Sequence, residues 1–364
     1  MKFRCERDVL VEALGTASRA VSSRGGSLPV LSGVRAELRG DQLELTGSDL
    51  DLTIATRTTV TGEEDGVTVV PARLATDIVR ALEPGRVDVA VTDDEARIKA
   101  GRSQFSIRVL PAEEFPRLGE PPEHSVTIAA ADFATALRQV VPAASSDDAR
   151  PILTGVLLAA EEDGLRLVAT DSYRLALRDL PGASILAEGQ SVLVPSRALA
   201  ELARLLDPGA EVVLHLGERE ATFEVGTVRL TTRLIEGEFP PYRNLIPQSY
   251  PNRLTVGREP LLDAVRRVKL MAREATPVRL RLVPDGLELM AITQDVGQAQ
   301  EELDAKYEGA ELTVAFNPDY LLTGVEATPG DEVGIETLDA LKPAVIRSSE
   351  ESGFLYLLMP VRVS

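Results

Sequence analysis

Side chains that commonly carry chemistry are scarce in this chain. His124 and His215 are the only histidines among 364 residues, and Cys5 is the only cysteine. His124 lies in a linker, and His215 lies in an alternating, strand-like segment where a lone histidine is usually structural. Because zinc sites need clusters of Cys and His ligands, we expect neither a zinc site nor another metal site. A single cysteine also excludes an internal disulfide.

Catalytic motifs are missing as well. The paired carboxylates Glu63-Glu64, Asp93-Asp94 and Glu161-Glu162 lie in polar, turn-like stretches, where solvated turns explain them. The chain contains no G-x-x-x-x-G-K-[ST] phosphate loop, no G-x-G-x-x-G turn, no G-x-S-x-G elbow and no H-E-x-x-H pair. We therefore expect no catalytic residue, no cofactor and no enzymatic activity.

Composition indicates a soluble protein of two or three domains. The chain carries 39 basic and 57 acidic side chains, a formal charge of −18, which is unlike a typical DNA-binding protein. Its longest apolar run, Phe354–Val361, is far shorter than the roughly 20 residues that span a bilayer. The first residues show no apolar segment of a signal peptide. We expect a cytoplasmic protein without a membrane partner.

Internal repetition is the strongest feature of the sequence. Val70-Pro71-Ala72-Arg73 returns as Val194-Pro195-Ser196-Arg197, 124 residues later, and a weaker third copy contains Phe316-Asn317-Pro318. Glu114-Phe115-Pro116 returns at the same offset as Glu238-Phe239-Pro240. A period of this length is the size of a whole domain. Together with the proline-rich linkers, it predicts three homologous domains, at residues 1–119, 125–245 and 253–364.

Each repeat mixes two kinds of periodicity. Alternating segments predict strands at 42–46, 87–91, 165–168, 278–282 and 287–289. Apolar residues three and four apart predict two helices per repeat, at 6–22 and 72–86, 130–146 and 195–207, and 258–274 and 317–327. Asp132 and Ser196 are the predicted N-caps of two helices. The fold class is therefore α+β, with three β-rich domains of two helices each.

Charge is distributed unevenly between these elements. The six predicted helical segments carry about 13 basic and 13 acidic residues, so strands and loops hold the whole deficit. Segment 258–274 is the most basic of them. One interpretation is that the helix faces are balanced by chance. The other is that the helices share a surface facing a polyanion while the strands face solvent.

Several ordered motifs resemble one family over the full length of the chain. They include Leu45-Thr46-Gly47-Ser48-Asp49-Leu50, Val168 to Ala176, Glu238 to Arg243, and Met359-Pro360-Val361-Arg362. Their order and spacing resemble the bacterial sliding clamps, the beta subunits of the replicative DNA polymerase. The resemblance implies a DNA clamp fold, in which two protomers meet head to tail in a closed ring, with helices inside and sheets outside.

Such a clamp would encircle double-stranded DNA without reading its sequence. The resemblance implies as further partners the replicative DNA polymerase catalytic subunit, the ATP-dependent clamp loader, and clamp-motif peptides of repair polymerases, ligase and mismatch-repair proteins. A β-rich adaptor that never encircles DNA is the alternative function. Inward-facing basic helices would separate the two.

A peptide-binding groove between the second and third domains is the main site that the resemblance implies. Apolar side chains would line a pocket, while Arg174, Arg362 and Asn317 would bind polar peptide atoms. Ser172 and Tyr173 stand where the family often has Gly and His. Leu357 fits a groove and a buried edge strand equally well. The implied residues are Leu153, Thr170, Ser172, Tyr173, Arg174, Leu175, Pro240, Asn244, Leu245, Asn317, Tyr320, Leu341, Pro343, Leu357, Met359, Pro360, Val361 and Arg362.

Two smaller residue sets follow from the same resemblance. Arg24 and Arg73 match positions that approach duplex phosphates, so their contacts would not depend on base sequence. Phe105 and Ile107 of one protomer would pack near Leu270 and Met271 of its partner in a homodimer. Alternatively, the last two residues belong only to the core of their own domain.

Overall fold

The computed structural model describes residues 1–21, 28–116, 119, 121–122, 125–183, 185–207, 209–247, 249–272, 276–284 and 286–362. By contacts the chain forms two compact units. Unit 1 comprises Met1–Ala130 with Arg204–Leu234, and unit 2 comprises Ala131–Ala203 with Ile235–Ser364. Among the described residues, no helix is long and apolar enough to cross a membrane.

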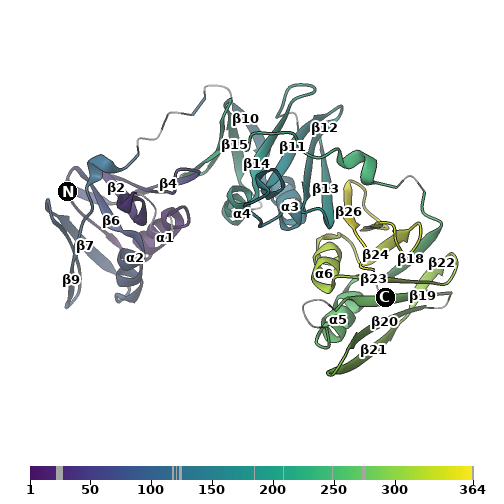
Figure 1. Ribbon diagram of the computed structural model, residues 1–364. Helices are drawn as coiled ribbons and strands as arrows, with labels where there is room; N and C mark the ends of the chain where they lie inside the picture. Colours follow the sequence, from purple (N-terminus) through teal and green to yellow (C-terminus); the bar gives the residue numbers. More distant parts are fainter. Residues whose placement is uncertain are drawn as a thin grey trace. The chain divides into compact units, whose positions relative to one another are not determined.

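The first repeat begins and ends with strands around two helices (Figure 1). Its helices are α1 (Arg7–Ser18) and α2 (Ala72–Ala81), which pack side by side. A short 3-10 helix η1 (Pro29–Ser32) precedes β2, and η2 (Ala112–Glu114) follows β9. The strands are β1 (Lys2–Glu6), β2 (Gly33–Arg39), β3 (Gln42–Ser48), β4 (Leu52–Thr59), β5 (Thr61–Glu64), β6 (Gly66–Pro71), β7 (Arg86–Val91), β8 (Glu95–Ala100) and β9 (Ser103–Arg108).

The second repeat has the same order of elements without an equivalent of β5. Its helices are α3 (Ala130–Val140) and α4 (Ser196–Leu205), with 3-10 helices η3 (Val141–Ala143), η4 (Pro151–Thr154) and η5 (Tyr242–Leu245). The strands are β10 (Ser125–Ala129), β11 (Gly155–Glu161), β12 (Gly164–Thr170), β13 (Arg174–Pro181), β14 (Ser191–Pro195), β15 (Glu211–Leu216), β16 (Glu220–Val225) and β17 (Val228–Arg233).

The third repeat restores the full set. Its helices α5 (Arg258–Lys269) and α6 (Pro318–Ala327) lie side by side (Figure 1). The strands are β18 (Asn252–Gly257), β19 (Val278–Val283), β20 (Gly286–Thr293), β21 (Gly297–Leu303), β22 (Ala305–Glu308), β23 (Leu312–Phe316), β24 (Glu332–Thr337), β25 (Ala344–Ser348) and β26 (Phe354–Leu358).

All six predicted helices and all five predicted strands are confirmed, but several helices end earlier than their apolar spacing indicated. α3 gives way at Val141 to a 3-10 turn that contains Pro142, because proline cannot continue an α-helix. The predicted N-cap at Asp132 is wrong, since α3 begins at Ala130 and places that carboxylate in its first turn. Ser196 is likewise the first helical residue of α4 rather than its cap.

Backbone geometry repeats along with the sequence. Among the described residues, three that are not glycine have positive φ: Leu50 at 80°, Ser172 at 82° and Asp295 at 64°. Each follows the third strand of its repeat, after β3, β12 or β20. Because L-residues rarely adopt this conformation, three occurrences at equivalent turns reflect one shared backbone design.

Two sheets continue from one repeat into the next. In unit 1 the order is β10-β15-β16-β17-β4-β3-β2-β6, and β17 pairs with β4 antiparallel; we call this pairing the first junction. In unit 2 the order is β14-β11-β12-β13-β26-β25-β24-β18-β22, and β26 pairs with β13; we call this the second junction. β26 is the outermost strand that the third repeat contributes to this sheet, and β13 of the second repeat covers its outer edge, so the interpretation of Leu357 as part of a buried edge strand of the third domain is confirmed.

The two remaining sheets have unpaired ends. The orders are β5-β1-β7-β8-β9 in unit 1 and β21-β20-β19-β23 in unit 2. Each junction joins the last strand of one repeat to the fourth strand of the repeat before it. Within the described part of the chain, the last strand β9 and the fourth strand β21 have a neighbour on one side only.

Candidate functional site

The turn between β12 and β13 begins the site. Asp171 is buried, and its carboxylate accepts hydrogen bonds from the backbone N–H groups of Tyr173 (2.9 Å) and Arg174 (3.0 Å). The same carboxylate pairs with Arg174 Nε at 3.0 Å. Thr170 Oγ1 donates to the Arg174 carbonyl at 2.6 Å and accepts from Ser172 N at 3.2 Å. The turn is thus fixed from inside, and the Tyr173 side chain projects outward.

Aromatic rings link this turn to α6. The rings of Tyr173 and Tyr320 are stacked with centroids 6.5 Å apart, and the Arg174 guanidinium lies 4.3 Å from the Tyr320 centroid. Burial opposes the charge of Arg174, but Tyr356 and Asp171 outweigh it and raise the pKa of Arg174 above its ordinary value. This arginine therefore stays charged beside an aromatic surface.

The chain that follows β26 borders the same turn. Met359 N donates to the Tyr173 carbonyl at 2.9 Å, and Val361 N donates to the Ala315 carbonyl at 2.8 Å. β25 pairs Ala344 with Leu358, so this register brings Pro343 beside Met359. Met359 and Val361 remain 38% and 37% exposed. An apolar, accessible strip thus follows the last strand.

The segment after the second repeat covers the sheet beside it. Tyr242 of η5 is buried in an apolar cluster with Val168, Leu175, Leu177, Val345 and Leu357, and Phe239 contacts its ring edge to face. Leu245 of the same 3-10 helix is 47% exposed. Because η5 is anchored by Tyr242, the position of Leu245 is fixed at the border of this cluster.

The predicted groove residues therefore divide by accessibility. Asn317 caps α6, because its Oδ1 accepts from Asp319 N at 2.9 Å and Tyr320 N at 3.2 Å. Four are buried: Leu153, Thr170, Leu175 and Leu357. Half-buried are Arg174, Pro240, Asn317, Tyr320, Pro343 and Pro360, and exposed are Ser172, Tyr173, Asn244, Leu245, Leu341, Met359, Val361 and Arg362.

Sequence reasoning missed three residues at this site. Asp171 holds Arg174, and Tyr242 anchors η5. Arg150 approaches the Asp171 carbonyl and Ser172 Oγ, each at 3.4 Å. An aspartate in the short turn between two predicted strands could have singled out Asp171, because such a carboxylate often accepts hydrogen bonds from the turn backbone. The interactions of Arg150 and Tyr242 are long-range and left no comparable signal.

Of the two predicted DNA-contact residues, Arg73 lies within the described part of the chain. Arg24 lies outside the described residues. Arg73 is the second residue of α2, its side chain is 97% exposed, and its Nε lies 3.9 Å from the carboxylate of Asp77 on the next turn. Over their observed lengths the six helices carry ten basic and nine acidic side chains, against −18 for the chain. The charge segregation predicted from the sequence is therefore confirmed.

The basic surface of α5 is largely neutralised by its neighbours. Arg266 pairs with Glu326 at 2.8 Å, and hydrogen bonding to that carboxylate raises the pKa of Arg266. The other pairs join Arg267 to Glu301 at 2.6 Å, Lys269 to Asp319, and Arg258 to Glu259. Screened, exposed pairs of this kind add little stability, but they reduce the local positive potential.

The predicted dimer residues lie at the unpaired ends. Phe105 on β9 is 39% exposed, whereas Ile107 packs into the core of its own repeat. Leu270, directly after α5, is 82% exposed, and Met271 approaches Gly297 at the start of β21. Ile292 and Val296 lie on either side of the turn between β20 and β21, and both are exposed. Sequence reasoning missed these two residues.

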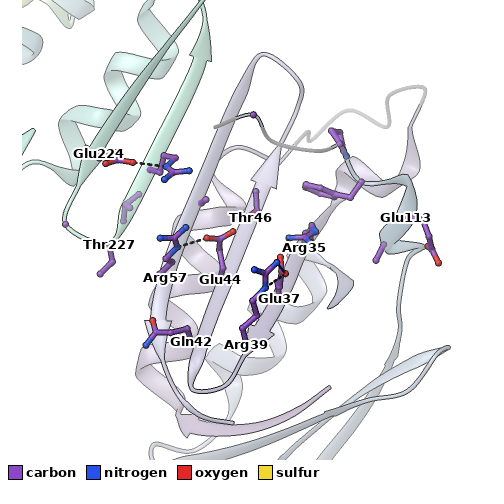
Figure 2. A pocket seen from close by; sticks show the side chains of 18 residues that line it. Arg35, Glu37, Arg39, Gln42, Glu44, Thr46, Arg57, Glu113, Glu224 and Thr227 are labelled. Carbon is purple, nitrogen blue, oxygen red and sulfur yellow. Dashed lines mark hydrogen bonds and ion pairs between the residues drawn. The ribbon is translucent and has the colours of Figure 1, made fainter. Parts of the chain in front are cut away.

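A separate cavity of about 1280 Å³ opens on the sheet of unit 1 (Figure 2). Its wall is polar: Arg57 pairs with Glu44 at 2.6 Å, and Arg229 pairs with Glu224 at 2.9 Å. Burial would raise the pKa of Glu37, but hydrogen bonds from Arg35 and Arg39 outweigh it and lower that pKa. Charges of both signs are thus matched within the cavity.

Comparison with known proteins covers the whole chain. Family models of the DNA polymerase III beta subunit match its N-terminal domain at residues 1–119, its central domain at 127–241 and its C-terminal domain at 243–362. The beta sliding clamp of Streptomyces coelicolor is 36% identical over 381 aligned positions, covering all of both chains.

Solved structures agree over the full length of both chains. The sliding clamp of Bartonella birtlesii bound to griselimycin has a TM-score of 0.94 at 32% identity, and that of Bacillus subtilis has 0.92 at 32%. These relatives support the clamp and not the adaptor. The chain belongs to the DNA polymerase III beta subunit family, the bacterial beta sliding clamps.

Proposed function

We propose that two copies of this chain close into a ring around duplex DNA by repeating the strand pairing of the two junctions. The last strand of a repeat pairs twice with the fourth strand of the preceding repeat, β17 with β4 and β26 with β13. The same rule, applied to the open edges of β9 and β21, requires a second chain. Two such contacts between identical protomers close a ring. This repeated pairing is the observation that carries the proposal.

The contact would bury Phe105 of one protomer near Leu270 and Met271 of its partner, with Ile292 and Val296 beside them. All of these apolar side chains except the half-buried Met271 are exposed, and they suit the desolvated centre of an interface. Sedimentation of the wild type at micromolar concentration should give about twice the chain mass of 39.1 kDa. Leu270→Arg should give monomers, while Leu74→Arg, a change at an exposed leucine of α2, should leave the dimer intact. A monomeric wild type would contradict the ring.

DNA would pass through the ring without base-specific contacts. The helices are close to neutral, so attraction to phosphates is weak and depends on salt. Purified protein loaded on nicked circular DNA should remain bound and should leave after the DNA is linearised. Equal loss from circular and linear DNA would contradict encirclement. Replacing Arg73 by Ala should lower the salt slope of binding by about one, because one phosphate contact is lost.

The surface around the second junction would bind short peptides of partner proteins. This surface offers the exposed apolar side chains of Tyr173, Leu245 and Met359 together with the charged Arg174. In this family the partners are the replicative polymerase, the clamp loader and repair proteins, and a related clamp binds griselimycin. Micromolar affinity is the expected scale for so few anchors.

A substitution that leaves the fold intact tests this peptide surface. Met359→Ala should weaken binding of a synthetic peptide ending in Leu-Phe, with an unchanged melting temperature. Val67→Ala, at an exposed apolar residue of β6, is the matched control. If Met359→Ala and Arg362→Ala both bind like the wild type, the assignment of the surface fails even where the ring is correct.

The remaining parts of the proposal follow from the clamp mechanism. Domains at 1–119, 125–245 and 253–364 supply the three segments of each protomer, and the family-model ranges support this division. A ring acts by topology, so the protein needs neither a catalysed reaction nor a cofactor. Its place of action would be the cytoplasm.

A further inference from the structure

Tyr356 is a large buried polar side chain that the surface described above does not include. It is fully buried in β26, between β25 and β13. Side chains alternate along a strand, so the side chain of Tyr356 points to the face opposite that of its neighbour Leu357. Its hydroxyl donates to the main-chain carbonyl of Tyr320 in α6 at 2.9 Å.

The phenolic oxygen has a second partner on the peptide surface. The phenolic oxygen also interacts with the side chain of Arg174, and burial raises the pKa of Tyr356 well above its ordinary range. The hydroxyl therefore keeps its proton and donates it to the Tyr320 carbonyl, which leaves its lone pairs available to the Arg174 guanidinium. The buried Tyr356 hydroxyl thus connects the main chain of α6 to Arg174, the first residue of β13.

The Tyr356 ring also determines how closely α6 approaches the sheet. A Cβ built on Gly324 of α6 would lie 2.5 Å from the ring, a distance that real atoms do not adopt. The absence of a side chain at Gly324 lets the helix rest on the ring. The hydroxyl can then reach Tyr320 one turn earlier on the same helix.

We propose that Tyr356 is a positioning residue for peptide binding, acting through Arg174 and Tyr320. This inference rests on the proposed peptide surface. Arg174 is held on one side by Asp171 and lies over the Tyr320 ring, so its direction depends on partners from two elements. Removing the phenolic oxygen would free the guanidinium on the side of α6 and leave a buried carbonyl without its donor.

Tyr356→Phe tests the proposal because it removes one oxygen and keeps the ring. With a fluorescent synthetic peptide ending in Leu-Phe, the variant should bind about three- to tenfold more weakly than the wild type, as expected for loss of a charge-assisted hydrogen bond. Tyr307→Phe is the matched control. Tyr307 is also buried in the third repeat, and its hydroxyl contacts Asn252 and the Ala310 carbonyl, away from the residues of the peptide surface.

A double-mutant cycle separates positioning from general stability. In an Arg174→Ala background, Tyr356→Phe should cost less than twofold in affinity, because the group that it positions is gone. An effect of equal size in both backgrounds would show a merely structural role and would overturn the inference. The cycle also holds when Tyr356→Phe lowers the melting temperature, provided that binding is measured below the unfolding transition.

Two failures are distinguishable. If the wild type does not bind the peptide, the proposed peptide surface is wrong and this inference falls with it. If the wild type binds and Tyr356→Phe binds equally well, the inference alone is overturned. Weakening by Tyr307→Phe as large as that by Tyr356→Phe would also overturn it.

Discussion

The two junctions have one backbone design and opposite chemistry. Register places Arg35, Thr46 and Ala55 on one face of the first junction sheet, where they line the open cavity (Figure 2). The equivalent residues of the second junction sheet are Leu157, Val168 and Leu177, which belong to an apolar cluster. Three polar or small side chains thus correspond to three large aliphatic ones. The first face forms the wall of an open cavity, and the second is covered by Phe239 and Tyr242.

Both junction sheets have a cross-strand ion pair at the same position. Glu44 faces Arg57 across β3 and β4, while Arg166 faces Asp179 across β12 and β13 at the equivalent position. Both pairs have a shortest distance of 2.6 Å, but the signs are exchanged. This position therefore accommodates an ion pair in either order of charges.

The difference is the reason why we propose a peptide surface at only one junction. Binding of a short peptide needs apolar anchors over a dry floor with a few polar groups. Leu175 and Leu357 supply that floor at the second junction. At the first junction every arginine named on the cavity wall already has a carboxylate partner. A peptide would therefore have to displace these ion pairs as well as water.

The largest expected loss of stability comes from removing the aromatic ring that covers the second junction. Tyr242→Ala should lower the free energy of unfolding by about 3–5 kcal/mol, because a buried aromatic ring is lost and its cavity only partly collapses. Peptide binding should be lost with it. Arg39→Ala at the exposed border of the first junction cavity is the control, with an effect within about 0.5 kcal/mol. Equal effects in thermal unfolding would show that the two faces do not differ as described.

Much of this architecture is predictable from the sequence. Glu114-Phe115-Pro116 and its copy 124 residues later reveal the repeat, and spacing reveals the six helices. Local patterns also indicate the strands, because alternation depends only on neighbours along the chain. The spacing of apolar residues does not locate the ends of helices. Asp132 resembles an N-cap, yet α3 begins two residues before it.

Long-range pairing is what the sequence did not reveal. The apolar run at β26 looks like an edge strand, since nothing local indicates that β13 pairs with it. Tyr356 likewise acts through Tyr320 and Arg174, which lie far away in sequence. The groove residues came from resemblance, and their burial, from 1% exposed at Leu175 to 65% at Leu341, depends on tertiary packing.

A second prediction compares two exposed leucines. Leu245 at the second junction and Leu50 at the turn of the first are 47% and 43% exposed. Leu245→Ala should weaken binding of the Leu-Phe peptide by about 1–3 kcal/mol, as expected for an anchor residue, and Leu50→Ala should not change it. Fluorescence anisotropy with both variants measures the difference. Weakening by Leu50→Ala would place a second peptide surface at the first junction.

A third prediction uses the exchanged ion pair. Arg166→Glu places three carboxylates together, with Asp179 and Glu161, and should destabilise the protein by about 1–2 kcal/mol. Adding Asp179→Arg should recover most of that loss, because the first junction uses the same order of charges. Chemical denaturation of the single and double variants gives the coupling energy. A double variant no more stable than Arg166→Glu would show that the two sheets are not equivalent at this position.

The smallest expected effect concerns pH and Glu37 in the first junction cavity. Burial raises the pKa of this carboxyl, but hydrogen bonds from Arg35 and Arg39 prevail, so its folded-state pKa lies below the unfolded value. A depressed pKa contributes stability above the unfolded pKa, about 4.3, and this contribution disappears as pH falls through the folded pKa. Glu37→Gln should therefore cost about 0.5 kcal/mol at pH 7 and almost nothing well below pH 4. Ala159 occupies the equivalent position at the second junction, so Ala159→Ser should show no such dependence on pH. A cost for Glu37→Gln that is constant from pH 7 to pH 3 would mean that the ion pairs of the cavity do not stabilise the fold.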